Sequence, residues 1–222
     1  MIKMVKVLGF LFLMFAIVSC NKDNPSPDFK YNFYPLNLKK VLIYNVDSTA
    51  VSSFAGTKTN FKFQIKDSVA DIYTDATNRT AYRIERYKKQ TNESVWKFQK
   101  IISRVLNTRN AEETIDNKTF VRLVFPPEIG TSWNGNSKND FIEKEFSITE
   151  MYDTFLLKNL AFNNTLVTHF EEVNLIREDK ETHTYAQGVG LIASDVRAVD
   201  VDISNQKVTN GFFYTMELIA YR

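Results

Sequence analysis

Apolar side chains recur at every second position along much of this chain, and this period constrains the fold more than any other feature. Phe61, Phe63 and Ile65 alternate with polar neighbours. Such alternation over four to eight residues is typical of a strand with one buried face. The pattern recurs at residues 82–84, 96–98, 121–125, 146–148, 199–203 and 212–221.

Short polar segments typical of turns separate these strands, at residues 75–78, 90–92, 116–117, 134–135 and 205–206. The mature chain has no convincing helical period, and residues 111–115 could form at most one helical turn. Regular hairpin spacing predicts antiparallel pairing throughout. We therefore expect a single all-β domain over residues 29–222, built from one strongly curved antiparallel sheet that forms a barrel or half-barrel. A β-sandwich is the alternative.

Two strands have apolar side chains on both faces, at residues 120–125 and 212–220. This composition favours either central strands covered on each side or a wall that curves around an interior. A filled sandwich core and an open cavity both satisfy it. If the sheet encloses a cavity, we expect its lining to include these side chains or their alternating neighbours: Phe120, Val124, Phe213 and Ile219.

The N-terminus has the layout of a bacterial export signal. Two lysines precede the 12 apolar residues 7–18, a run too short to span a bilayer as a helix, which takes roughly 20 residues. The sequence Ile17-Val18-Ser19-Cys20 then matches the lipobox, in which a lipidated cysteine becomes the first residue of the mature chain. We predict a signal peptide over residues 1–19, a lipidated Cys20 that anchors the protein to a membrane, and a flexible tether over residues 20–28.

The charge balance limits the possible partners. The precursor has 28 basic and 26 acidic residues, and two lysines leave with the signal, so the mature chain is formally neutral. A neutral chain has no general attraction to nucleic acid, and we predict no nucleic-acid partner. We expect a monomer.

Motifs for cofactor and metal binding are weak. Residues 188–193 fit the dinucleotide pattern G-x-G-x-x-A, but a strand-like alternation follows them where the pattern needs a helix. We therefore interpret Gly188 and Gly190 as structural. His169 and His183 are the only histidines, and we interpret them as solvent-facing strand residues. No cofactor and no metal site are predicted.

Catalytic motifs are equally weak. There is no Gly-x-Ser-x-Gly elbow, and the only cysteine is the one predicted to be lipidated. Trp96 and Trp133 could stack on sugars, but we interpret both as core residues, with Trp133 at one end of the fold. Two pairs of acids could serve a glycosidase, but their spacing favours a solvated strand surface. These pairs are Asp200 with Asp202, and Glu143 with Glu145.

Several local patterns together resemble an uncharacterised family of Bacteroidota lipoproteins, and the resemblance covers most of the mature chain. It implies a β-rich protein of the cell envelope and no known reaction. The motif Tyr185-Ala186-Gln187-Gly188-Val189-Gly190-Leu191 is also similar to secreted β proteins with curved sheets, the lipoprotein carriers among them, which implies a lipocalin-like or carrier-like sheet. The other patterns are Tyr34-Pro35-Leu36, Tyr44 to Ser48, Tyr82 to Tyr87, Leu123 to Pro126, Trp133 to Asn136 and Asn174 to Ile176.

These features favour a lipid-anchored envelope protein, at the outer membrane, with a non-enzymatic binding or accessory role. It would hold an apolar small molecule in the curved sheet or dock to another envelope protein. The alternative is a surface lipoprotein that hydrolyses or binds glycans. An acid-lined cleft would favour the glycan hydrolase, and an apolar interior would favour the binding protein.

Overall fold

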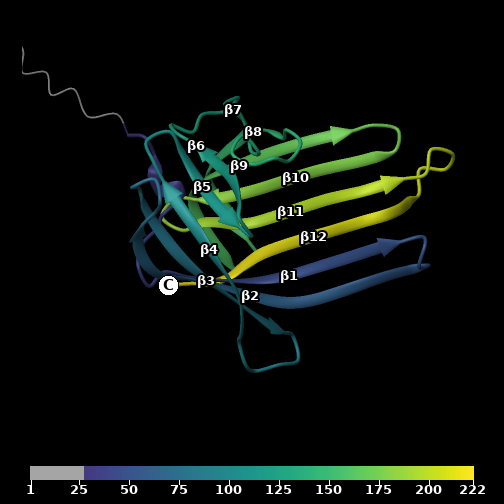
Figure 1. The fold of residues 1–222 in the computed structure, drawn as a ribbon, viewed down its shortest axis with the longest axis horizontal. Helices are drawn as coiled ribbons and strands as arrows, with labels where there is room; N and C mark the ends of the chain where they lie inside the picture. The colour runs from purple at the N-terminus through teal and green to yellow at the C-terminus, as the bar shows by residue number, and fades with distance from the viewer. Residues whose placement is uncertain (1–27) are drawn as a thin grey trace, which may run out of the picture.

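The computed structural model describes residues 28–222, and all of their strands belong to one antiparallel sheet. The predicted signal peptide, Cys20 and almost all of the tether lie outside these residues. The strand order is β6-β5-β4-β3-β2-β1-β12-β11-β10-β9-β8-β7, so every sheet neighbour except the β1–β12 pair is also a neighbour in sequence (Figure 1). The all-β prediction is confirmed, because the described residues contain no α-helix. Their one helical element is the 3-10 turn η2 (Tyr31–Phe33), which precedes the first strand.

The strands vary from short edge segments to long hairpins. Their bounds are β1 (Val41–Ser52), β2 (Thr57–Thr74), β3 (Thr80–Gln90), β4 (Lys97–Leu106), β5 (Asn110–Ile115), β6 (Lys118–Val124), β7 (Ser132–Asn134), β8 (Glu145–Leu157), β9 (Leu160–Val173), β10 (Arg177–Ala186), β11 (Gly190–Val201) and β12 (Val208–Tyr221).

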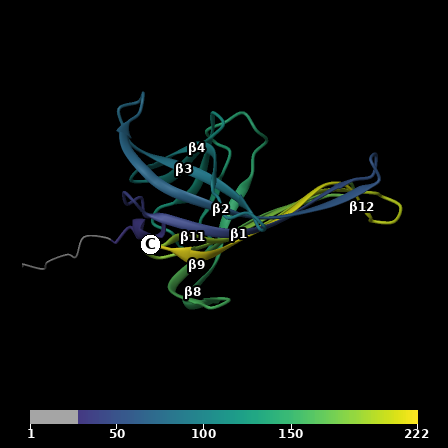
Figure 2. The ribbon, with the colours of Figure 1, turned by 90° about the horizontal axis from the view of Figure 1, so that it is seen from below.

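The sheet curves into a nearly closed barrel, as predicted. Its two edge strands meet where the Val121 N–H of β6 donates to the carbonyl of Gly135, just after β7, at 2.9 Å. The indole Nε1 of Trp133 donates to the Val121 carbonyl across the same junction, at 3.0 Å. Trp133 therefore joins the two edges of the sheet. Figure 2 shows that the hairpins of β1 with β2 and of β11 with β12 continue beyond the barrel as a flat extension.

Two local predictions from the sequence are wrong. Residues 111–115, which could have formed a helical turn, belong to β5, because β4 and β6 satisfy its backbone groups on both sides. Trp96 is not in the core: it precedes β4, and the ammonium groups of Lys66 and Lys89 lie 5.1 and 4.9 Å from its ring. Phe98 is 56% exposed. This end of β4 therefore lies outside the barrel interior.

The segment before β1, residues 28–40, closes one end of the barrel, and we call it the N-terminal plug. Phe33, Tyr34 and Leu36 are buried, and they pack in one apolar cluster with Leu123, Ile148, Leu166 and Tyr185. The turn between β10 and β11 is bonded to this plug, because the Gly188 N–H donates to the carbonyl of Asn32 at 2.7 Å. A strand, β11, follows Gly190, so the helix that a dinucleotide site requires is missing from this place.

Candidate functional site

The barrel interior contains two adjoining cavities. The inner cavity, of about 350 Å³, lies against the N-terminal plug, and the outer cavity, of about 730 Å³, lies toward the exposed side chains of Phe141 and Ile142. Six residues line both, so the two form one continuous hollow: Phe120, Arg122, Glu181, His183, Val196 and Phe212.

One wall of the hollow is apolar and comes from β11 and β12. The pairs Val196 with Tyr214 and Ala198 with Phe212 lie directly opposite each other in the antiparallel register, so their side chains share a face. Met216, from β12, extends this apolar face into the inner cavity. The alternation in the last strand of the sequence therefore produces an apolar lining.

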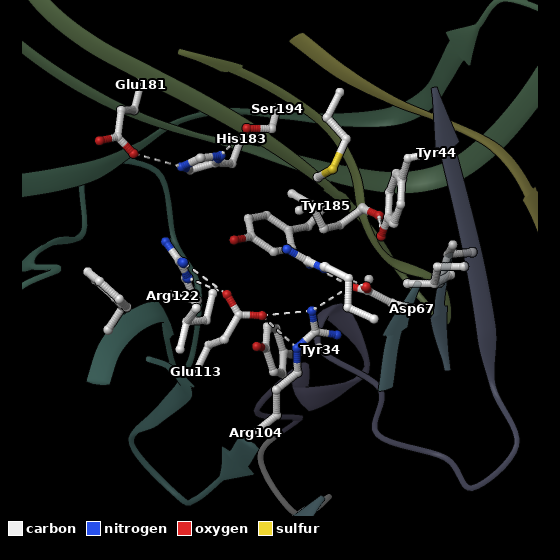
Figure 3. Close-up of a pocket in the computed structure, with 18 of the residues that line it drawn as sticks. Tyr34, Tyr44, Asp67, Arg104, Glu113, Arg122, Glu181, His183, Tyr185 and Ser194 are labelled. Atoms are coloured by element: carbon white, nitrogen blue, oxygen red, sulfur yellow. Dashed lines mark hydrogen bonds and ion pairs between the residues drawn. The ribbon is translucent and has the colours of Figure 1, made fainter. Parts of the chain in front are cut away.

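The facing wall carries a row of alternating charges that we call the charge ladder. Each of five consecutive strands supplies one member: Asp67 (β2), Arg86 (β3), Arg104 (β4), Glu113 (β5) and Arg122 (β6). All five line the inner cavity, and Figure 3 labels four of them: Asp67, Arg104, Glu113 and Arg122. The signs alternate in the order of contact, which is Arg86–Asp67–Arg104–Glu113–Arg122.

The ladder contacts are short and geometrically specific. Nε and Nη2 of Arg86 donate to the two carboxylate oxygens of Asp67, at 2.7 Å each. Arg104 bridges the two acids, with Nη2 3.2 Å from Asp67 Oδ2 and Nε 2.7 Å from Glu113 Oε2. Nε and Nη2 of Arg122 both contact Glu113 Oε1, at 3.0 and 2.9 Å. The acids are therefore fully used by the arginines.

The ladder keeps its acids charged and has an excess of positive charge. Burial alone would raise the pKa of Glu113, but Arg104 and Arg122 outweigh it and hold the pKa of this carboxyl well below its usual range. Three guanidinium groups face two carboxylates, so the ladder carries one uncompensated positive charge.

The row of contacts begins and ends with an arginine, and Arg122 is the end that lines both cavities. In the β5–β6 register Ala111 pairs with Leu123 and Glu112 with Val121, so Arg122 is an extra residue in a β-bulge. Arg122 lines the hollow on the same face as Phe120, two residues before it, and its guanidinium lies 4.8 Å from the Phe120 ring. Among the described residues its Nη1 nitrogen has no hydrogen-bond partner.

Three buried tyrosines complete the inner cavity. The hydroxyl of Tyr44 donates to the Leu191 carbonyl at 2.9 Å. The hydroxyl of Tyr34 is buried and has no hydrogen-bond partner among the described residues. Burial raises the pKa of Tyr34 and of Tyr185 well above the usual tyrosine range, so both hydroxyls stay protonated and can donate. Tyr185 extends into the space between Arg122 and Tyr44 (Figure 3).

A second polar cluster lies where the two cavities join. The Nδ1 atom of His183 is 3.0 Å from Ser194 Oγ, and its Nε2 atom is 3.3 Å from Glu181 Oε2. Lys144 contacts both Glu181 and Asp179. Burial alone would raise the pKa of Glu181, but the hydrogen bond from His183 and the charge of Lys144 lower it to about 2. Lys144 therefore serves two carboxylates, and His183 lies beside one of them.

The interpretation of the histidines is correct for one and wrong for the other. His169 is partly exposed, bonded to Thr182 and near Glu171. His183 is only 9% exposed and lies inside the barrel, stacked on Phe146 at 5.7 Å. It shares the inward face of β10 with Tyr185, and the sequence alternation alone could not assign that face.

The expected cavity residues divide between the two faces of the sheet. Phe120 lines both cavities. Val124, Phe213 and Ile219 do not line either one. Arg197, on the outer face, stacks over Phe213 at 4.9 Å, and the alternating neighbours of Phe213 and Ile219 supply the lining from β12: Phe212, Tyr214 and Met216.

Three of the four paired acids have hydrogen-bond or ion-pair partners, and the fourth, Glu143, lines the outer cavity. Asp200 binds Arg177 at 2.8 Å, and Asp202 accepts hydrogen bonds in the β11–β12 turn. Glu145 accepts from Ser132 at 2.9 Å, and Glu143 lines the outer cavity. Both turn glycines have positive φ: 75° for Gly188 and 97° for Gly190. The described residues contain no cluster of three or more potential metal ligands, and no helix among them is long and apolar enough to cross a membrane.

The sequence reasoning missed the charge ladder, although the sequence contains a signal for it. Asp67 follows Phe63 and Ile65 at the same apolar parity, Arg86 follows Ile84, and Arg104 follows Ile102. A charge at an inward position interrupts the apolar pattern. Since a buried charge is costly without a partner, several such interruptions on successive strands predict mutual pairing.

Comparisons with known proteins find similarity in two solved structures. The first is a protein from Bacteroides fragilis described as exported and as having a YmcC-like fold, with 10% identity and a TM-score of 0.47. The second is a protein from Parabacteroides distasonis described as a lipoprotein, with 9% identity and a TM-score of 0.45. Each alignment covers 86% of this chain and 98% of the other. No family model matches the sequence, and no curated protein matches it.

Proposed function

We propose that this protein is a lipid-anchored protein of the cell envelope that binds a small molecule with an apolar chain inside its barrel, without catalysing a reaction. The observation that carries the proposal is the continuous hollow, whose inner and outer parts measure about 350 and 730 Å³. Ligand sites in proteins commonly have this size and an apolar lining with a few polar groups. The lipobox at Cys20 supports the envelope location and places the barrel beside a membrane, a source of apolar molecules.

The apolar wall can supply useful binding free energy. At about 25 cal/mol per Å², burying roughly 300 Å² of an acyl chain contributes about 7 kcal/mol before the losses of association. A net dissociation constant in the micromolar range is then expected. The formally neutral mature chain offers no long-range steering, so the affinity must come from the interior itself.

The side chains with catalytic potential support a binding role. Of the acids considered for a glycosidase, Asp200 forms an ion pair with Arg177, Asp202 accepts a hydrogen bond in a turn, and Glu145 accepts one from Ser132. The row Ser194–His183–Glu181 is explained by strand pairing, since His183 and Ser194 are directly opposite in the β10–β11 register.

A direct binding measurement tests the proposal. All strands and all cavity-lining residues lie between Tyr34 and Tyr221, so a chain that begins at Asn21 retains the whole described fold. This chain should bind a fluorescent fatty acid saturably while it remains folded. Val196→Glu, which places a charge on the apolar wall, should weaken binding, whereas Val173→Glu, on the exposed β9 end, should not. Absence of saturable binding would refute the proposal and favour docking to another envelope protein.

A further inference from the structure

Building on the proposed function, we infer that the ligand carries an anionic group, a carboxylate or a phosphate, which binds beside Arg122, Tyr34 and Tyr185 at the inner end of the hollow. The apolar chain would then lie along the β11–β12 wall toward the outer cavity. The charge ladder, the unpartnered donors and the shape of the hollow lead to this assignment.

The charge of the ladder is the first argument. Asp67 is fully engaged by Arg86 and Arg104, and Glu113 is engaged by Arg104 and Arg122. After these pairs are formed, one guanidinium charge has no counter-ion within the ladder. An anion near Arg122 would complete the alternation of signs along the row.

The free donors are the second argument. Nη1 of Arg122 has no acceptor among the described residues, while its other two donor nitrogens hold Glu113 in place. The Tyr34 hydroxyl is also buried without a partner, an arrangement that is costly in a folded protein unless something else accepts the proton. Tyr44, by contrast, already donates to a backbone carbonyl. Arg122 and Tyr34 thus present unused donors, and both line the same cavity.

The acid nearest the proposed anion does not oppose it. Glu181 also lines the inner cavity, but Lys144 and His183 are its partners. Lys144 additionally contacts Asp179, which Arg177 approaches at 3.7 Å. Glu181 is thus held by its own partners, no contact joins it to Arg122 among the described residues, and the free donor of Arg122 stays available.

Four matched 12-carbon ligands test the inference: dodecanoate, dodecyl phosphate, dodecanol and dodecylammonium, with inorganic phosphate as a fifth probe. Their affinities for the chain that begins at Asn21 can be measured by isothermal titration calorimetry below the concentrations at which they aggregate. Both anionic ligands should bind about tenfold or more tightly than dodecanol, because charge-assisted hydrogen bonds are the strong ones. Dodecylammonium should bind least tightly.

Two substitutions locate the anion. Arg122→Gln should abolish the preference for dodecanoate over dodecanol, because it removes the charge that the anionic group would contact. Arg197→Gln is the matched control, because Arg197 pairs with Glu178 and lies outside the hollow. Tyr34→Phe removes only the unpartnered hydroxyl, so it should weaken dodecanoate binding severalfold without lowering the melting temperature of the free protein.

The outcomes separate the inference from the proposed function. Equal affinity for dodecanoate and dodecanol would overturn the anionic group while leaving apolar binding intact. Saturable binding of none of the 12-carbon ligands would refute the proposed function. Tight binding of inorganic phosphate alone would keep an anion site and refute the acyl chain. If Arg122→Gln does not fold, unchanged dodecanoate affinity in Tyr34→Phe would overturn the inference.

Discussion

Asp67→Asn should strongly destabilise the protein. The Asp67 side chain is 3% exposed and accepts three contacts from two arginines, at 2.7, 2.7 and 3.2 Å. Asparagine keeps the shape but removes the charge, and its amide group would place a donor against the donors of Arg86 or Arg104. The excess charge of the ladder would rise from one to two.

The expected magnitude follows from the burial of the ladder. Removing one partner of a buried ion pair costs about 3–5 kcal/mol, because it leaves an uncompensated charge inside the protein. For a domain of this size, a loss of 4 kcal/mol corresponds to a fall of roughly 10 °C in melting temperature. Urea unfolding, followed by tryptophan fluorescence and by circular dichroism, would give the free energy of unfolding and test two-state behaviour.

Asp47→Asn is the matched control. Asp47 lies on β1 and pairs with Lys62 at 3.2 Å, but both side chains are exposed to solvent. Exposed ion pairs contribute about 0–1 kcal/mol, so this variant should unfold close to the wild-type midpoint. If Asp67→Asn also lies within 1 kcal/mol of the wild type, the view that the ladder stabilises the fold is wrong.

Further predictions concern the lipid anchor, two glycines, the stability of the protein at acid pH, and catalysis. Cys20→Ala should abolish acyl labelling and leave uncleaved precursor; unchanged palmitate incorporation would exclude the lipobox. Gly211→Ala should destabilise more than Gly190→Ala (about 1 kcal/mol or more): both glycines have positive φ, but a Cβ at Gly211 would lie 2.2 Å from the Ala198 carbonyl oxygen, against 3.5 Å from Pro35 at Gly190. Equal melting temperatures would contradict this order. The pKa of Glu181 is lowered to about 2, so ionised Glu181 should add about 3 kcal/mol to the free energy of unfolding above pH 4.5, and this stabilisation should be lost as the pH falls toward 2. A free energy of unfolding that stays constant over this range in denaturant titrations would contradict the prediction. The protein should not hydrolyse p-nitrophenyl esters, and turnover that disappears in Ser194→Ala would show that it is an enzyme.

The fold was largely predictable from the sequence because apolar and polar side chains alternate along the individual strands. The turn at Asp116 and Asn117, for example, forms at the predicted residues with φ values of 49° and 63°, which asparagine and aspartate tolerate. The predicted curvature rested on the two doubly apolar strands. The choice of face was less predictable: in β12 the lining comes from Phe212 and not from Phe213, because both faces of that strand are apolar.

The site was less predictable because it depends on pairings between distant strands. Alternation places Arg122 on the same face as Phe120, but no local pattern shows that Glu113 of the neighbouring strand pairs with it or that a bulge lies at this residue. Asp67 and Arg104 are 37 positions apart in sequence and meet only because the barrel is curved. Charges at inward positions could be recognised, but the order of the ladder required the strand register.

The pairing of β1 with β12 has a consequence for how the interior is assembled. Residues 41–124 and residues 132–221 each form a six-stranded meander of consecutive hairpins, and the β1–β12 ladder is the strand pairing that connects the two halves, with the Val121–Gly135 hydrogen bond at the opposite edges. The first half supplies the charge ladder, and the second supplies the apolar wall. Local hairpins form quickly, whereas closing a loop across the whole chain is slow. We therefore expect the hollow to form in the last folding event, and a ligand that contacted both walls would hold the two halves together.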